Sequence, residues 1–88
     1  MPERAPSIRI RVLLFAHLAR ETGEREITLE LPEHATVSDA LERLAGQYPQ
    51  VARMGQRLVS AVNMEYVKPR HRLSNGDELA LIPPVSGG

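Results

Sequence analysis

The stretch TVSDALERLAGQY, residues 36–48, decides the fold. Its apolar residues recur at intervals of three and four, which places them on one face of a helix. Thr36 is a good N-cap, and Asp39 follows three residues later, as in a capping box. Gly46 and Pro49 are expected to bring the helix to an end. We therefore predict one amphipathic helix that needs a sheet to cover its apolar face. The residues of that face are Val37, Ala40, Leu41, Leu44, Ala45 and Tyr48.

A strand and a short helix are predicted to begin the folded part of the chain. Residues 8–15 alternate with a period of two, which is typical of a strand with one buried face. The opposite face begins charged and ends apolar, at Leu13 and Phe15, so we expect another part of the molecule to cover that end. Residues 16–22 are predicted to form a short helix, with Gly23 as its C-terminal stop. The side chains of the strand expected in the core are Ile8, Ile10, Val12 and Leu14.

Three further stretches are predicted as strands because they are apolar or alternate in polarity: residues 26–31, 58–64 and 78–82. In the last of them, Leu79 and Leu81 are expected on one face and Ala80 and Ile82 on the other. The turn before it is predicted from Ser74-Asn75-Gly76-Asp77, since Asn and Gly tolerate positive φ. Two connections are predicted to be irregular: residues 50–57, and the charged loop 65–73, where a short strand around Tyr66 and Val67 is the alternative.

The order strand, strand, helix, strand, strand predicts an α+β protein in which helices cover one face of a sheet. This order and length fit a β-grasp fold, a mixed sheet with one main helix packed on one face and a short second helix. A ferredoxin-like fold would need a second long helix after the third strand, and residues 65–73 do not supply one. We divide the chain into a flexible tail 1–6, a domain 7–82 and an extended functional tail 83–88.

Composition excludes several classes of function. The 88 residues suit one small domain, which leaves little room for a deep active site. The formal net charge is zero, so no long-range field attracts nucleic acid or an anionic membrane. The absence of cysteine excludes a disulfide, a thiolate metal site and a cysteine nucleophile. The start of the chain does not read as a signal peptide, and a cytoplasmic protein is expected.

Two groups of polar residues invite a functional interpretation. The three histidines His17, His34 and His71 lie on separate segments without ligand-like spacing, so we predict solvated histidines and no metal site. A small basic cluster occupies one loop and consists of Lys68, Arg70, His71 and Arg72. It is either a contact for an acidic partner or a phosphate, or an ordinary solvated loop. The sequence leaves these alternatives open.

The tail Pro83-Pro84-Val85-Ser86-Gly87-Gly88 is the unusual feature of the chain. The two prolines favour an extended exit from the sheet, and six extended residues span roughly 20 Å. Glycine at the end lets the carboxylate enter a narrow channel of a partner. A carboxylate is a poor electrophile, and ATP can activate it as an acyl-adenylate that a sulfur nucleophile then converts into a thiocarboxylate. The alternative is that the Gly-Gly end has no function.

The sequence resembles a known family over nearly all of its length after residue 6. Residues 15–23, FAHLARETG, resemble that family's F-A-x-L-R-E-x-x-G segment, and residues 62–67, VNMEYV, resemble its V-N-x-x-x-V. Residues 73–80, LSNGDELA, resemble L-x-D-G-D-E-V-A, and the ending IPPVSGG, residues 82–88, is the most specific part. The family is the small subunit of molybdopterin synthase. Two positions depart from it, because Ala19 stands where Arg is frequent and Asn75 where Asp is usual.

The resemblance implies a ubiquitin-like sulfur carrier that does not catalyse alone. It implies that an activating enzyme uses ATP to adenylate Gly88, that a sulfurtransferase supplies the sulfur, and that no cofactor is bound permanently. Gly87 and Gly88 would enter the large subunit of the synthase and pass sulfur to cyclic pyranopterin monophosphate, within a heterotetramer. The residues implied in partner binding are Phe15, Tyr66, Ile82, Pro83, Pro84, Val85 and Ser86.

Three rival functions remain at this point. One is a sulfur carrier of another pathway, such as thiamine synthesis. The second is a ubiquitin-like modifier that is joined through Gly88 to lysines of other proteins. The third is an interaction domain with an inert tail. Phe15, Tyr66 and Ile82 have an alternative as well, since the chain's own short helix and loops could cover them.

Overall fold

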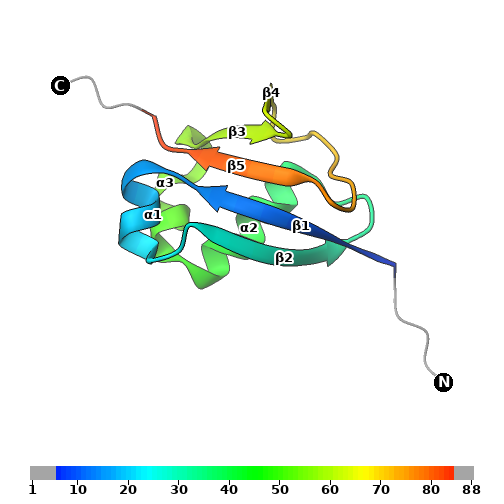
Figure 1. Cartoon of the computed structure of the whole chain (residues 1–88), viewed down its shortest axis with the longest axis horizontal. Coiled ribbons are helices and arrows are strands. Elements are labelled where there is room, and N and C mark those ends of the chain that lie inside the picture. Colours follow the sequence, from blue (N-terminus) through cyan, green and yellow to red (C-terminus); the bar gives the residue numbers. More distant parts are fainter. Residues whose placement is uncertain (1–5, 85–88) are drawn as a thin grey trace.

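The computed structural model describes residues 6–84 and shows a five-stranded mixed sheet with helices on one face (Figure 1). The strand order is β2-β1-β5-β3-β4, in which β1 and β5 are parallel and the other neighbours are antiparallel. The architecture is therefore α+β with a mixed sheet, as predicted. The elements in chain order are β1 (Ser7–Leu14), α1 (Ala16–Thr22), β2 (Glu26–Pro32), α2 (Val37–Gln47), α3 (Pro49–Met54), the 3-10 turn η1 (Gly55–Arg57), β3 (Val59–Val62), β4 (Glu65–Val67) and β5 (Glu78–Ile82).

Helix α2 begins as its sequence predicts. The Asp39 backbone N–H donates to the Thr36 hydroxyl at 3.3 Å, and the Thr36 N–H donates to the Asp39 carboxylate at 2.8 Å. This capping box satisfies two backbone donors at the helix start. Val37, Ala40 and Leu44 are fully buried under the sheet. The inward residues predicted for the first and last strands are buried with them, namely Ile8, Ile10, Val12, Leu14, Leu79 and Leu81.

The predicted end of α2 needs one correction. The helix runs through Gly46 and ends at Gln47, so Gly46 does not terminate it. A single glycine within a helix costs only about 1 kcal/mol relative to alanine, which tertiary burial can offset. Pro49 sets the boundary, because the residue before a proline avoids helical geometry, and Tyr48 is extended with ψ 103°.

The prediction of an irregular connection over residues 50–57 is wrong. These residues belong to α3 and η1, which follow α2 directly. Pro49 suits the first position of a helix, and Val51 is buried at 2% exposure with Met54 packed beside the core. Such a short helix gains its stability from tertiary packing, which local sequence patterns do not report.

The third strand is shorter than predicted because its end turns back into a hairpin. It ends at Val62, and Asn63 and Met64 both take positive φ, 50° and 73°. Two residues with positive φ form the type of turn that joins tightly twisted antiparallel strands. The strand that follows is β4, so the alternative of a short strand around Tyr66 and Val67 is confirmed.

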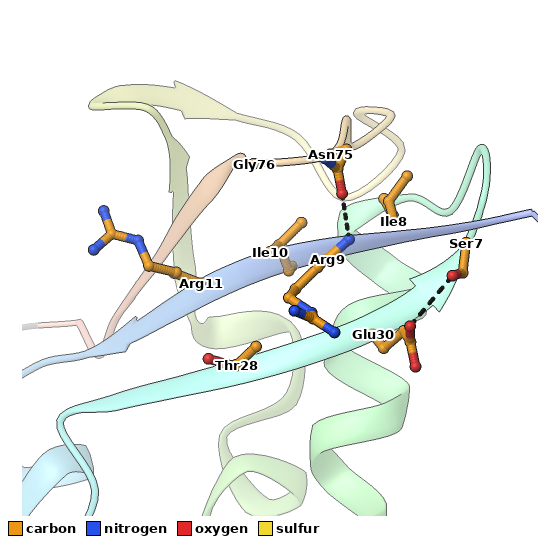
Figure 2. A pocket seen from close by; sticks show the side chains of 9 residues that line it. All are labelled: Ser7, Ile8, Arg9, Ile10, Arg11, Thr28, Glu30, Asn75 and Gly76. Carbon is orange, nitrogen blue, oxygen red and sulfur yellow. Dashed lines mark hydrogen bonds between the residues drawn. The ribbon is translucent and has the colours of Figure 1, made fainter.

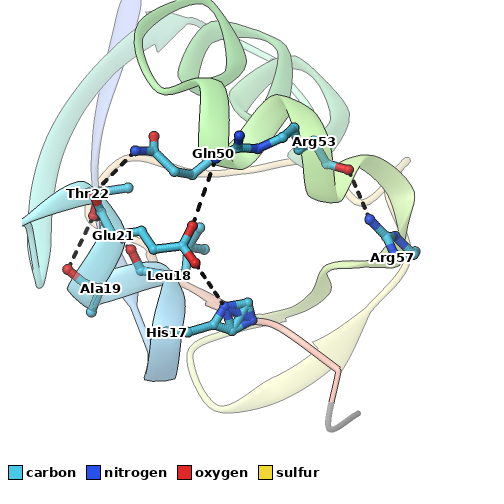
Figure 3. Close-up of polar contacts among 8 residues, drawn as sticks. All are labelled: His17, Leu18, Ala19, Glu21, Thr22, Gln50, Arg53 and Arg57. Atoms are coloured by element: carbon cyan, nitrogen blue, oxygen red, sulfur yellow. Dashed lines mark hydrogen bonds and ion pairs between the residues drawn. The ribbon is translucent and has the colours of Figure 1, made fainter.

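Helix α1 is held against α3 at one end of the sheet (Figure 3). Leu18 is buried, and the Gln50 side-chain amide donates to the Glu21 carbonyl at 3.2 Å. The Glu21 carboxylate lies 3.8 Å from His17 and 3.9 Å from Arg53. Exposed ion pairs of this kind contribute at most about 1 kcal/mol each, so Leu18 supplies most of the attachment.

The predicted turn at residues 74–77 is present, and it is docked onto β1 (Figure 2). The Arg9 backbone N–H donates to the Asn75 side-chain oxygen at 2.8 Å, and the Gly76 N–H donates to the Arg9 carbonyl at 2.8 Å. Gly76 has φ 86°, which favours glycine. These bonds hold the start of β5 beside β1, so both strands deliver their apolar ends to the same end of the sheet.

Candidate functional site: an apolar face beside the tail

The face of the sheet opposite to the helices carries a row of apolar side chains. The strand register places Leu13 beside Ala80, Ala80 beside Ala61, and Ala61 beside Tyr66. Directly opposed residues of neighbouring strands point to the same face, so this row crosses four strands. Tyr66, at the end of this row on the edge strand β4, is 79% exposed.

A second apolar row lies nearer to the tail. Ile82, the last residue of β5, pairs with Val59, the first residue of β3. Phe15 extends the alternation of β1 by one residue. Phe15 and Val59 are exposed, and Ile82 is half-buried. The two rows together form a surface that we call the outer apolar patch, made of Leu13, Phe15, Val59, Ala61, Tyr66, Ala80 and Ile82.

The expectation that the apolar end of this face is covered does not hold for Phe15. Its side chain is 44% exposed, and within residues 6–84 neither α1 nor a loop encloses it. A cavity of about 610 Å³ adjoins it, lined in part by Arg20 and Arg25. The next residue, Ala16, has φ 55°, which is an unfavourable conformation for alanine. The exposed phenylalanine thus belongs to the outer apolar patch and also lines a cleft that carries two arginines.

The other end of the same face is polar. The Arg11 guanidinium lies 2.6 Å from the Glu78 carboxylate and 3.9 Å from that of Glu26. A shallow cavity of about 530 Å³ lies there, and Arg9, Thr28 and further polar residues line it (Figure 2). An exposed apolar patch rimmed by polar residues is a common feature of protein interaction surfaces. Strand β5 runs from the polar end to the apolar end and releases the tail there.

The predicted tail residues are only partly placed. Pro83 is buried in the chain itself, and Pro84 is exposed. Val85, Ser86, Gly87 and Gly88 lie outside the described residues. The roles assigned to these residues, and to Phe15, Tyr66 and Ile82 in partner binding, remain predictions. The structure brings Phe15 and Ile82 to the end of the sheet where the tail begins.

Sequence reasoning missed Val59, Ala61 and Ala80 as members of the patch. The sequence predicts that Ala80 lies on the face opposite to Leu79 and Leu81. It does not predict the neighbours of Ala80, because alternation within one strand does not show which strands lie beside that strand. Val59 and Ala61 lie in β3, a largely apolar strand in which Val59 is exposed and the other three residues are buried. Only the register identifies which of its residues face outward.

The three histidines lie on separate segments and are not members of the outer apolar patch. His17 and His34 each lie near one glutamate on their own segment, at 3.8 Å and 3.2 Å. Among residues 6–84, no three histidine, cysteine or acidic side chains gather as a metal site would need. Within the same residues, none of the helices has the length and apolar character to cross a membrane.

A helix-backed mixed sheet with an apolar face beside its C-terminal strand defines a ubiquitin-like β-grasp protein. The fold is that of the solved ubiquitin from Caldiarchaeum subterraneum, with a TM-score of 0.64 at 16% identity, covering 94% of this chain and all of that one. The chain belongs to the ThiS family, whose model matches residues 12–88.

Two relatives are similar over most of the chain. The molybdopterin synthase sulfur carrier subunit of Arabidopsis thaliana is 38% identical over 82 residues, covering 93% of this chain and 85% of the relative. Small archaeal modifier protein 1 of Haloferax volcanii is 39% identical over 83 residues, covering 85% and 95%. A crystal structure of that modifier has a TM-score of 0.80 at 31% identity, covering 89% of this chain and 99% of that one.

Proposed function

We propose that this chain is the sulfur-carrier subunit of a molybdopterin synthase. Its Gly88 carboxylate is adenylated with ATP by an activating enzyme and converted into a thiocarboxylate with sulfur from a sulfurtransferase. The large synthase subunit then receives the tail, and the sulfur passes to cyclic pyranopterin monophosphate. The chain itself supplies the carrier group and no catalytic side chains, and we propose that it works in the cytoplasm.

The observation that carries this proposal is the position of the tail. β5 ends at Ile82 beside Val59 and close to Phe15, so a partner that covers the outer apolar patch meets the start of the tail as well. The tail that follows ends in two glycines. The similarity to a sulfur carrier subunit over 93% of the chain supports the same function.

The chemistry of the tail indicates which protein supplies the reaction sites. Water and stray nucleophiles attack an acyl-adenylate, and stray electrophiles and oxidants react with the sulfur of a thiocarboxylate, so both need an enclosed site. A domain of this size offers open clefts on its own surface. We therefore propose that the enclosed sites belong to the activating enzyme and to the large subunit, each of which docks on the outer apolar patch.

Mass spectrometry of the intact chain tests the proposal. After incubation with the activating enzyme, ATP and a sulfur source, we expect a gain equal to the replacement of one oxygen by sulfur, located on Gly88 by fragmentation. The variant that lacks Gly88 should keep its fold by circular dichroism and gain no sulfur. Full synthase activity of that truncated chain would refute the proposal. Delivery to thiamine-pathway enzymes instead of the large subunit would favour the other sulfur-carrier pathway.

A second function, covalent modification of other proteins through Gly88, is favoured by one specific observation. The modifier of Haloferax volcanii is 39% identical to this chain, and the sulfur carrier subunit of Arabidopsis thaliana is 38% identical to it. Both functions begin with the same adenylate, and they differ only in whether sulfur or an amine attacks it. Conjugates in cell extract that disappear when Gly88 is deleted would establish this function.

A further inference from the structure

Lys68 is the only lysine in the sequence, and all other strongly basic side chains are arginines. An arginine guanidinium stays protonated and does not attack carbonyl carbon, whereas a lysine amine does so after it loses a proton. Side-chain amine chemistry in this protein is therefore confined to one position. The carboxyl terminus of this protein is proposed to be activated as an acyl group. Lys68 carries the one side-chain amine of the protein that can accept this acyl group and form an amide.

The structure presents Lys68 on an anchored loop. Lys68 follows the edge strand β4 directly, and its side chain is exposed. Its carbonyl accepts a hydrogen bond from the His71 N–H at 2.9 Å, which closes a turn. The Pro69 and His71 carbonyls accept from the Ser38 and Val37 N–H groups at 2.8 and 2.9 Å. The backbone beside the amine is thus fixed to the first turn of α2.

Lys68 also lines a groove of about 580 Å³ between the helices and strands β3 and β4. The floor of this groove is largely apolar and includes Leu41, Ala45, Val51, Leu58 and Val67, whereas Ala52 and Pro69 are exposed at its rim. The groove opens on the helical side of the edge strand, and it adjoins the outer apolar patch there, because Val59 and Tyr66 line the groove and also belong to the patch.

The tail of a second copy suits this groove by length and by chemistry. The five residues from Pro84 to Gly88 span roughly 17 Å when extended, and Pro84 and Val85 are the apolar side chains that an apolar floor can receive. Gly87 and Gly88 carry no Cβ, so the terminal carbonyl carbon can approach a side-chain amine closely.

We propose that Lys68 is the acceptor through which copies of this chain are joined, with the donor's tail seated in the groove beside it. This proposal rests on the second of the two functions above. The linkage is an isopeptide bond between the Gly88 carbonyl carbon of one copy and the Lys68 Nζ of the next. Because each copy has one lysine, each copy can accept only one donor tail on a side chain, and the product is a linear polymer.

The reaction balances with ATP as the co-reactant. The Gly88 carboxylate displaces pyrophosphate from ATP and becomes an acyl-adenylate. The neutral Lys68 amine attacks the acyl carbon and forms the C–N bond. The bond from the acyl carbon to the phosphate oxygen breaks, AMP leaves with that electron pair, and the nitrogen releases its proton to solvent. Nothing is oxidised or reduced.

The loop around Lys68 favours an anionic leaving group. Residues 68–72 include Arg70 and Arg72, both exposed, and no acidic residue. A cationic loop attracts the negatively charged adenylate phosphate to the amine that attacks the acyl carbon. This assigns a role to the basic cluster, which the sulfur-carrier function leaves without one.

The test uses the full chain with its activating enzyme and ATP, without a sulfur source. We expect dimers and longer species on denaturing gels, with a Gly88–Lys68 isopeptide in the peptide map. Lys68→Arg keeps the charge and should reduce these species at least tenfold. In the matched control, Lys68→Arg is combined with Arg9→Lys, which moves the lysine to the exposed polar end of the other face. This relocated lysine should stay unmodified. Ala52→Glu, on the exposed rim of the groove, should slow joining while Lys68 is retained.

Pyrophosphate release separates failure of this proposal from failure of the proposed function. If pyrophosphate is released but no copies are joined, the proposed role of Lys68 is wrong. It is also wrong if copies are joined equally well through the relocated lysine or through the α-amino group. If no pyrophosphate is released, the proposed adenylation has failed, and a chemically prepared C-terminal thioester of the chain then serves as donor. Selective attack of that thioester by Lys68 over the relocated lysine supports the proposal, and unselective attack overturns it.

Discussion

Truncation of Phe15 measures how much binding energy the outer apolar patch supplies. Phe15 is 44% exposed, and a phenylalanine presents roughly 200 Å², so about 90 Å² is available for burial by a partner. At about 25 cal/mol per Å², Phe15→Ala should weaken docking by about 2 kcal/mol, which is roughly 30-fold in Kd. This value lies in the range of about 1–3 kcal/mol that truncated interface anchors show.

Isothermal titration calorimetry with the large synthase subunit is the assay. Arg9→Ala is the matched control, since Arg9 is exposed at the polar end of the same face and makes its hydrogen bonds to Asn75 and Gly76 through its backbone. Circular dichroism and a urea titration of each variant separate lost binding from lost folding. An unchanged Kd for folded Phe15→Ala, or an equal loss for Arg9→Ala, would refute the assignment of the docking face to the apolar end.

Three predictions concern stability, each measured by urea unfolding. Met64→Gly should stabilise the chain by about 0.5–1 kcal/mol, because Met64 holds φ 73° in the hairpin turn and is 91% exposed, and a decrease in stability would contradict this explanation. Thr36→Ala should cost about 1 kcal/mol by removing the capping box, whereas Thr36→Ser should retain most of it. Leu44→Ala should cost about 2–5 kcal/mol, because Leu44 is fully buried under the sheet, and a loss below 1 kcal/mol would show that the core collapses around the gap.

The elements with strong local signals were predictable in detail. The capping box at Thr36 and Asp39, the glycine stop at Gly23 and the turn at Asn75 and Gly76 all act between residues close in sequence, and all three are present. The short helix α3 was missed because its stability comes from the burial of Val51 under distant parts of the chain. The end of β3 was missed because Met64, a residue that rarely takes positive φ, completes the hairpin turn.

The sequence by itself determined the α+β class, the alternation of β1 and β5, the two glycines that end the tail and the single lysine, because each depends on neighbouring residues or on composition. Only the tertiary structure decided that Leu13, Ala80, Ala61 and Tyr66 form one row and that Lys68 adjoins an apolar groove. The physical reason is that strand order and register are set by burial of the whole core. Burial of this kind joins residues that are far apart in the chain and that no local pattern connects.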